Sequence, residues 1–205
     1  MTIDQAGIRK AVLDFGLFGD EKTGILRRFD IMLSAFPTAF YVDRELALVK
    51  AMGGEPSRKL AEKVLIDAAQ WSANQIFSGV MASPEWKSLI EPKIQNMQDR
   101  LQGMIAITNC LGWDLVTDYK LDESAKTLQL TIKHSYYIDA YKNRYGKNSE
   151  YPICYMWTGT AGGYMDLLFG QKPNTFVATE TTCAAKSGDI CVFEAKISKT
   201  KFGFN

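Results

Sequence analysis

The sequence predicts an α/β domain of the α+β type, with helices packed on an antiparallel sheet. Apolar residues recur at helical spacing through the first half of the chain, and the second half alternates as strands do, with helical segments in between. Hydrophobic side chains make up 46% of the 205 residues, enough for a sizeable core. We expect an N-terminal extension over residues 1–23 and a single domain over residues 24–205.

Charge and hydropathy exclude several classes of partner. The chain has 24 basic and 23 acidic residues, so nothing in its charge indicates binding to nucleic acid or to an anionic membrane. The N-terminus has no apolar signal core, and no later run is long and apolar enough to span a bilayer. We therefore expect a cytoplasmic protein whose four cysteines are thiols or metal ligands rather than disulfides.

The first third of the chain predicts helices separated by turns. Residues 4–23 form a short amphipathic helix followed by a glycine-containing turn. An apolar stretch then runs from Gly24 to Pro37, where proline stops it. A helix fits residues 39–52 and ends at the Gly53-Gly54 pair, a helix C-terminal signal.

The next helix is expected to begin after Ser57, a good N-cap residue. It has two neighbouring apolar lines, one of Leu60, Val64, Ala68, Ile76 and Val80 and the other of Ala61, Leu65, Ala69, Ala73 and Phe77. So wide an apolar face predicts a helix buried on more than one side.

Ser83 and Pro84 predict the start of another helix, as N-cap and first helical residue. Pro92 is expected to break or kink it. Apolar residues continue at helical spacing from Ile94 to Leu111. This face packs either within the chain or on a second copy, and packing within one chain is the commoner case.

The pattern then changes to that of strands. Residues 113–121 and 127–134 alternate, and the polar segment 122–126 between them predicts an antiparallel hairpin. A short helix is expected over residues 136–145, ended by Gly146.

A helix over residues 153–169 has small residues at its centre, which we interpret as close packing of this helix on the sheet. Strands over residues 174–182 and 190–198 complete the prediction.

Three cysteines and a glutamate occur together in this last part. Cys183 and Cys191 flank a Lys-Ser-Gly-Asp turn, Glu180 precedes Cys183 by three residues, and Cys154 begins the small-residue helix. A hairpin turn would bring both sulfurs to one side, and zinc favours thiolates in four-ligand structural sites. The alternative is that the cysteines are small buried apolar residues and that Glu180 lies on a strand surface. Spacing alone leaves both interpretations open.

The same stretch resembles a known family. The pattern is Pro152-x-Cys154, Gly159, Gly163-Tyr164, Gly170, Glu180-x-x-Cys183 and Gly188-Asp189-x-Cys191-x-Phe193. It is similar to the 4-vinyl reductase domain, which is also the sensor half of bacterial activators of aromatic catabolism. The likeness covers about residues 24–198. It implies a fold related to the TRAPP and haem-NO-binding proteins, an apolar pocket for small aromatic or hydrocarbon ligands, and a homodimer.

The resemblance also implies site residues. It implies a closed, structural zinc site made by Cys154, Glu180, Cys183 and Cys191. The histidine and tryptophan with which the phenol-type sensors hold their ligand align with Asp99 and Ile132, neither of which can reproduce that contact. The predicted ligand-binding residues are Asp99, Trp113, Ile132, His134, Trp157, Tyr164 and Phe176. For the aromatic residues of this set, the alternative to ligand binding is ordinary packing in the core. For His134 the alternative is a structural role.

Three functional hypotheses follow. The first is a stand-alone, zinc-stabilised domain that binds a small hydrophobic or aromatic molecule as a sensor or carrier and signals to a separate effector protein. The second is an accessory protein or enzyme of tetrapyrrole metabolism; it would need a partner, because no nucleotide or flavin motif supplies a reductant. The third is a TRAPP-like interaction subunit. With one histidine, and with Asp139 and Asp166 in no recognisable set, a non-enzymatic protein without catalytic residues is favoured.

Overall fold

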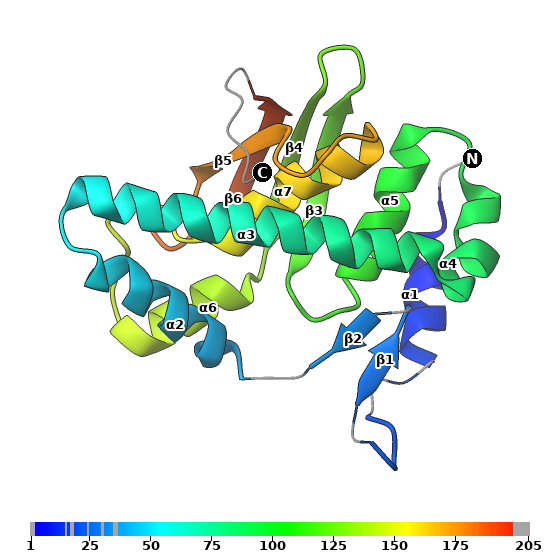
Figure 1. Ribbon diagram of the computed structural model, residues 1–205, viewed down its shortest axis with the longest axis horizontal. Coiled ribbons are helices and arrows are strands. Elements are labelled where there is room, and N and C mark those ends of the chain that lie inside the picture. The colour runs from blue at the N-terminus through cyan, green and yellow to red at the C-terminus, as the bar shows by residue number, and fades with distance from the viewer. Residues whose placement is uncertain are drawn as a thin grey trace. The chain divides into compact units, whose positions relative to one another are not determined.

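The computed structural model consists of helices and antiparallel sheets, which confirms the predicted fold class (Figure 1). It describes residues 3–14, 16, 19–23, 25–29, 31–34 and 37–198. The chain divides into two compact units, Met1–Ala35 with Gln75–Trp113, and Phe36–Asn74 with Asp114–Asn205. The longest helix, α3 (Glu55–Ala82), contributes residues to both units.

The first unit is mainly helical. Besides the end of α3 it contains α1 (Gln5–Asp14), β1 (Leu26–Arg28), β2 (Ile31–Leu33), α4 (Pro84–Leu89), the 3-10 turn η1 (Glu91–Lys93) and α5 (Met97–Thr108). Helix α1 contacts α5, and its apolar residues Ile8 and Val12 are buried. On α5, Leu101 and Met104 are fully buried, in agreement with core packing within one chain.

The predicted helix start at Ser83-Pro84 and the predicted interruption at Pro92 are confirmed. The Ser83 hydroxyl accepts a hydrogen bond from the Trp86 N–H at 3.2 Å, and Pro84 follows it as the first helical residue. Pro92 lies in η1, where the helical run is interrupted before α5. The hairpin of β1 and β2 was not predicted, because each strand has only three residues and such a run is too short to show alternation.

The second unit holds a four-stranded sheet covered by helices. Its elements besides the first part of α3 are α2 (Thr38–Ala51), β3 (Leu115–Asp122), β4 (Thr127–Lys133), α6 (Tyr136–Tyr145), α7 (Tyr155–Leu168), β5 (Phe176–Thr182) and β6 (Ile190–Ile197). All neighbouring strands are antiparallel, in the order β3-β4-β6-β5. The predicted strands and the helices α2, α6 and α7 are confirmed, with ends shifted by one or two residues.

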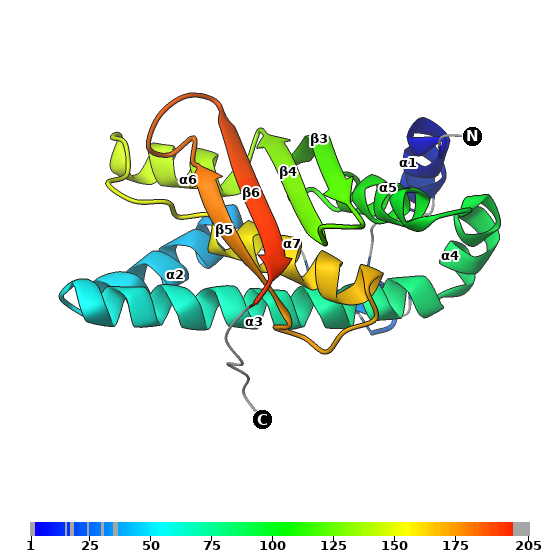
Figure 2. The same ribbon diagram turned by 90° about the horizontal axis from the view of Figure 1, so that it is seen from above.

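Helix α7 lies across β5 and β6, as Figure 2 shows, and α2 contacts α6. The side chains of Ile132, Cys191 and Phe193 are buried, and Ile132 pairs directly with Cys191 across β4 and β6. A bulge interrupts the β5–β6 register between Glu180 and Thr182, next to the predicted metal ligands.

Two expectations about α3 were wrong. The helix begins at Glu55, before Ser57, because the carbonyl of Gly54 already accepts a hydrogen bond from the Arg58 N–H at 3.1 Å. The helix is also not buried on both apolar lines: Leu60 and Val64 are 56% and 42% exposed. On the neighbouring line Ala61, Ala73 and Phe77 are buried, and on the first line Val80, near the end of the helix, is the residue that is fully buried.

The small residues of α7 pack against α3 rather than against the sheet, so the packing partner that we expected was wrong. A Cβ atom at Gly159 would lie 2.4 Å from the carbonyl oxygen of Ile66, and one at Gly163 would lie 2.9 Å from that of Gln70. The glycines therefore allow the two helix backbones to approach closely.

Candidate metal centre

The four predicted metal ligands meet at one buried point of the second unit. The sulfur atoms of Cys154, Cys183 and Cys191 and a carboxylate oxygen of Glu180 all lie within 4.8 Å of one another. Cys154 is the N-cap of α7, Glu180 is on β5, Cys191 is on β6, and Cys183 follows β5 in the connecting loop. Gly188, with φ +79°, allows that loop to reverse its direction.

The geometry of the cluster fits a tetrahedral ion. The sulfur atoms of Cys154 and Cys191 are 3.7 Å apart, too far for a disulfide, and all four cysteines of the chain are free thiols. Two thiolates bound to zinc at about 2.3 Å in a tetrahedron stand about 3.8 Å apart. The separation of the Cys154 and Cys191 sulfur atoms is thus close to that of two zinc-bound thiolates.

The two oxygen atoms of Glu180 differ in their surroundings. Oε2 accepts a hydrogen bond from the Cys154 N–H at 3.0 Å, whereas Oε1 is buried and has no hydrogen-bond partner. An unpartnered buried carboxylate oxygen is unfavourable unless something else binds it. Oε1 is therefore the oxygen available to a metal ion, and the backbone N–H holds the carboxylate in position.

The thiols have strongly perturbed pKa values. Burial, followed by hydrogen bonding with Cys183, raises the pKa of Cys154 well above its ordinary value. Hydrogen bonds from Cys154 and Cys191 lower the pKa of Cys183. At Cys191 hydrogen bonding with Cys154 lowers the pKa, but the hydrogen bond with Cys183 and burial outweigh it and the net pKa is raised.

The pKa of the Glu180 carboxyl is raised, as are those of the Cys154 and Cys191 thiols. Burial raises its pKa to about 8, helped by the nearby Cys183 and opposed by the Cys154 N–H. A divalent cation would reverse this balance, since it favours the deprotonated form of every ligand. The cluster thus has ligand types that suit Zn²⁺ and a Cys154–Cys191 sulfur distance that fits it. The cation would also offset the negative charge of the deprotonated ligands.

Four of the seven predicted ligand-binding residues are buried in the second unit. Trp157, Tyr164 and Phe176 are fully buried, and Ile132 is 1% exposed beside Cys191. The Trp157 ring packs against Phe193, with 6.3 Å between ring centroids. Ile132 lies beside Cys191, whereas Phe176 is at the opposite end of β5 from Glu180, close to Asp166.

The other three lie elsewhere. His134 is exposed at the end of β4, with a left-handed backbone (φ +54°). Asp99 and half-buried Trp113 belong to the first unit. The Asp99 carboxylate accepts a hydrogen bond from the Gln95 N–H at 3.0 Å, and its own N–H is capped by Asn96, so Asp99 stabilises the start of α5.

Two buried carboxylates were not recognised from the sequence. Asp166 accepts hydrogen bonds from the Gln70 side chain and from the N–H groups of Asn174, Thr175 and Phe176, at 2.6 to 3.1 Å. It ties the end of α7 to α3 and to the start of β5. No sequence signal links residue 166 to residue 70.

Asp114 is the second of these carboxylates. Its Oδ1 accepts the Tyr136 N–H at 2.6 Å and so caps α6. Burial raises its pKa to about 8, although hydrogen bonding to Tyr136, Ser135 and Trp157 acts in the opposite direction. The cap joins residues 22 positions apart, a separation that local sequence patterns do not reveal.

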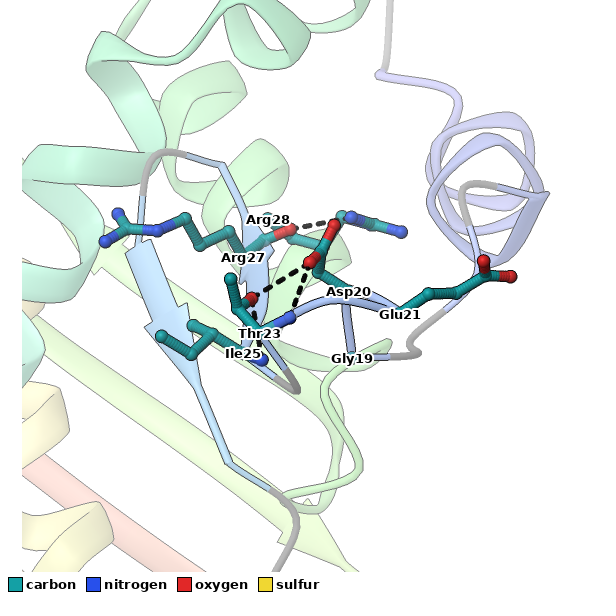
Figure 3. A pocket seen from close by; sticks show the side chains of 7 residues that line it. All are labelled: Gly19, Asp20, Glu21, Thr23, Ile25, Arg27 and Arg28. Carbon is teal, nitrogen blue, oxygen red and sulfur yellow. Dashed lines mark hydrogen bonds between the residues drawn. The ribbon is translucent and has the colours of Figure 1, made fainter.

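A surface hollow of about 710 Å³ lies in the first unit (Figure 3). Its lining residues are Gly19, Asp20, Glu21, Thr23, Ile25, Arg27 and Arg28. The Asp20 carboxylate accepts hydrogen bonds from the Thr23 N–H and hydroxyl at 2.9 and 3.0 Å, and these hold its pKa below the ordinary value. Asp20 thus serves the local turn, and none of the predicted site residues lines this hollow.

Among the described residues, no helix has both the length and the apolar character needed to cross a bilayer.

Comparison with known proteins identifies the fold. No protein-family model and no curated protein sequence matches the chain. Solved structures do match it. The phenol-responsive sensory domain of the transcription activator PoxR, crystallised with phenol, superimposes with a TM-score of 0.70 at 17% identity, over 96% of this chain and 92% of that one. Trafficking protein particle complex subunit 3 from Naegleria fowleri, covalently bound to palmitic acid, gives 0.52 at 9% identity, over 81% and 98%.

A vinyl-4-reductase family protein from Methanocaldococcus jannaschii also matches, more weakly, with a TM-score of 0.40 at 17% identity, over 82% of this chain and 98% of that one. The PoxR match, over 96% of this chain, confirms the predicted resemblance to such sensor domains at the level of the fold.

Proposed function

We propose that the protein is a zinc-stabilised domain of the 4-vinyl reductase type that holds a small hydrophobic or aromatic molecule, as a sensor or carrier. One observation carries the proposal: three thiols and a carboxylate converge within 4.8 Å inside the fold of a phenol-responsive sensory domain. The proposed role is binding rather than catalysis, in a cytoplasmic homodimer that passes its signal to a separate effector.

Zinc in this site would have a structural role. Four protein ligands complete a tetrahedron, which leaves no open position for a substrate or an activated water. The ligands join the start of α7 to the β5–β6 connection, so the metal would fix the helix on the sheet. The Cys154 and Ala184 N–H groups, which donate to Glu180 and to the Cys191 sulfur at 3.0 and 3.4 Å, offset the excess negative charge.

The buried apolar groups support a ligand of low polarity. Trp157, Tyr164, Phe176 and Ile132 supply buried aromatic and aliphatic groups in the second unit, with Ile132 directly beside Cys191. PoxR is described as phenol-responsive. Here the expected histidine and tryptophan are replaced by Asp99, engaged at a helix start, and by aliphatic Ile132. We therefore favour an aromatic or hydrocarbon ligand without a phenolic hydroxyl.

A second candidate is a TRAPP-like interaction subunit. The match to the trafficking-complex subunit, which carries palmitic acid, favours this alternative and would make the ligand a lipid-like chain. The tetrapyrrole alternative would predict a coloured protein on purification.

The test is native mass spectrometry of the purified chain beside its denatured mass, with zinc measured independently. We expect one zinc per chain and additional non-covalent mass from a ligand. In Cys183→Ser the zinc should fall to a small fraction of the wild-type content, because one of four ligands is lost. Cys110→Ser is the matched control: Cys110 is a buried thiol of the first unit that bonds to the Ala106 carbonyl at 3.1 Å, outside the cluster.

A Cys183→Ser protein that folds and retains full zinc would contradict the metal centre. A ligand that binds only the folded state must raise the melting temperature of the protein. The binding function would therefore be contradicted if the protein holds zinc but no other molecule and if toluene, naphthalene and a fatty acid all leave its melting temperature unchanged.

A further inference from the structure

Three polar side chains of the second unit come together where β3 and α6 begin and where α7 passes them. The Asp114 carboxylate accepts the Tyr136 N–H at 2.6 Å, which places it beside Ser135, the N-cap residue of α6. Burial raises the pKa of this carboxyl to about 8, although the Tyr136 N–H, the Ser135 hydroxyl and the Trp157 indole N–H beside it act in the opposite direction. Groups from three segments of the chain therefore face one point.

These groups have hydrogen-bonding capacity that the protein does not use. The hydroxyl oxygen of Ser135, the indole nitrogen of Trp157 and Oδ2 of Asp114 are buried, and among the described residues none of the three atoms has a hydrogen-bond partner in good geometry. Ser135 and Trp157 are 4% and 0% exposed. Unpartnered buried polar groups are unfavourable and rare in native proteins. Three of them at one point are typical of a site that binds a further polar group.

The donors and acceptors of this site favour a neutral hydroxyl group. The Trp157 indole N–H can only donate, so the group that faces it must have a lone pair, which excludes an ammonium ion. A carboxylate would bring a second negative charge to a buried place beside Asp114. A hydroxyl accepts from Trp157, and it suits Asp114 in either protonation state, because it donates to a carboxylate and accepts from a carboxylic acid. The Ser135 hydroxyl can complete the set in either direction.

We propose that Asp114, Ser135 and Trp157 form the polar end of the ligand site and bind the hydroxyl group of a small alcohol with an aromatic or hydrocarbon body. This inference rests on the proposed function and adds to it the class of ligand. The indole ring of Trp157 packs against Phe193, with 6.3 Å between ring centroids, so the N–H is the polar edge of an apolar group. An alcohol also agrees with the preference for a ligand without a phenolic hydroxyl.

Two ligands of equal size test the site. Benzyl alcohol and ethylbenzene have the same number of non-hydrogen atoms and differ only in a hydroxyl in place of a methyl group. Their affinities for the full chain are measured by isothermal titration calorimetry. In Ser135→Ala we expect the affinity for benzyl alcohol to fall about three- to tenfold, because one hydrogen bond is lost. The affinity for ethylbenzene should change by less than about twofold, because it makes no such bond.

Ser149→Ala is the matched control. Ser149 is also a buried serine of the second unit, 7% exposed, but its hydroxyl donates to the Tyr151 carbonyl at 2.7 Å. This variant should lose thermal stability and keep the wild-type ratio of the two affinities. Ser135→Ala should instead keep the melting temperature of the ligand-free wild type, since the Ser135 hydroxyl makes no hydrogen bond within the protein.

A second measurement needs no variant. The indole N–H proton of Trp157 is assigned in the NMR spectrum of the wild type from its contacts with the Phe193 ring. We expect benzyl alcohol to shift this signal downfield, because the N–H gains an acceptor, and ethylbenzene to shift it much less.

The outcomes separate the hydroxyl site from ligand binding itself. If Ser135→Ala changes both affinities equally or neither, or if benzyl alcohol binds and leaves the indole signal unchanged, the hydroxyl site is overturned and the three groups hold only water. The same conclusion follows if toluene, naphthalene or a fatty acid binds and benzyl alcohol does not. In each of these cases the proposed binding function stands. If none of these molecules binds, the hydroxyl site and the binding function are overturned together.

Discussion

Replacing Gly159 by alanine tests the close approach of α7 to α3. An added Cβ would lie 2.4 Å from the Ile66 carbonyl oxygen, 2.6 Å from the Ala69 Cβ and 2.6 Å from the Gln70 nitrogen. Ordinary contacts between such atoms are about 3.5 to 4.0 Å. Because two of the three obstacles are backbone atoms, no side-chain rotation relieves the clash, and α7 must move away from α3 by about 1 Å.

The expected loss of stability is about 2 kcal/mol. Overpacking a core typically costs about 1 to 3 kcal/mol, and a backbone obstacle places this change at the upper end. Alanine recovers about 1 kcal/mol of helix propensity relative to glycine. For a chain of this size the melting temperature should fall by roughly 4 to 8 °C. Since Cys154 is the N-cap of α7, the displacement should also weaken zinc binding, which a competition titration with a chelator would measure.

Two further variants distinguish the clash from a general effect of losing glycine. Gly54→Ala adds a Cβ that meets nothing within 4 Å and should change the melting temperature little. Ala69→Gly combined with Gly159→Ala removes only the side-chain contact, so it should not restore stability. A Gly159→Ala protein as stable as the wild type, or full rescue by Ala69→Gly, would refute the backbone approach.

Three more predictions concern buried ionisable groups. Asp166→Asn should lower the free energy of unfolding, measured in urea, by more than about 2 kcal/mol. The reason is that an amide nitrogen would replace a carboxylate oxygen that accepts hydrogen bonds from two N–H groups. A loss below about 0.5 kcal/mol would contradict this role of Asp166. The wild type should lose stability as pH rises from 3.8 toward about 8, since folded Asp114 keeps a proton that the unfolded chain releases, whereas Asp114→Asn should show a flatter profile in thermal melts. Zinc binding near pH 7 should release about three protons, from Cys154, Cys191 and Glu180, measurable by calorimetry in buffers of different ionisation enthalpy; release of none would mean that the ligands are already ionised.

The meeting of Glu180, Cys183 and Cys191 could be anticipated from the sequence because these three residues are close together along the chain. Glu180 and Cys183 are on or next to one strand end, and Cys191 follows the same turn. Cys154 comes from a distant segment: its place at a helix start made it a possible fourth ligand, and it was the family resemblance that implied the full set. What the spacing could not show is the bulge beside Glu180 and the backbone N–H that holds one of its oxygens.

The packing partners of the helices could not be predicted in the same way. Helical periodicity showed that α3 has two apolar lines, but both satisfy the same spacing, so it could not tell that Ala61 faces the core and Leu60 faces outward. Likewise, the glycines of α7 indicated a close neighbour without identifying it, and that neighbour is α3 rather than the sheet. Which side of an element is covered depends on the other elements, and that information is not local.

Helix α7 connects these features into one arrangement. Its start carries Cys154, which faces Glu180 at the far end of β5, and near its end Asp166 holds the first residue of β5, Phe176. Between these two points Gly159 and Gly163 lie against α3. The helix and the strand are thus held together at both ends by different chemistry. Asp166 accepts hydrogen bonds from donors within the protein, whereas one buried oxygen of Glu180 has no hydrogen-bond partner, so under the proposed function it is the Glu180 end that would need a metal ion.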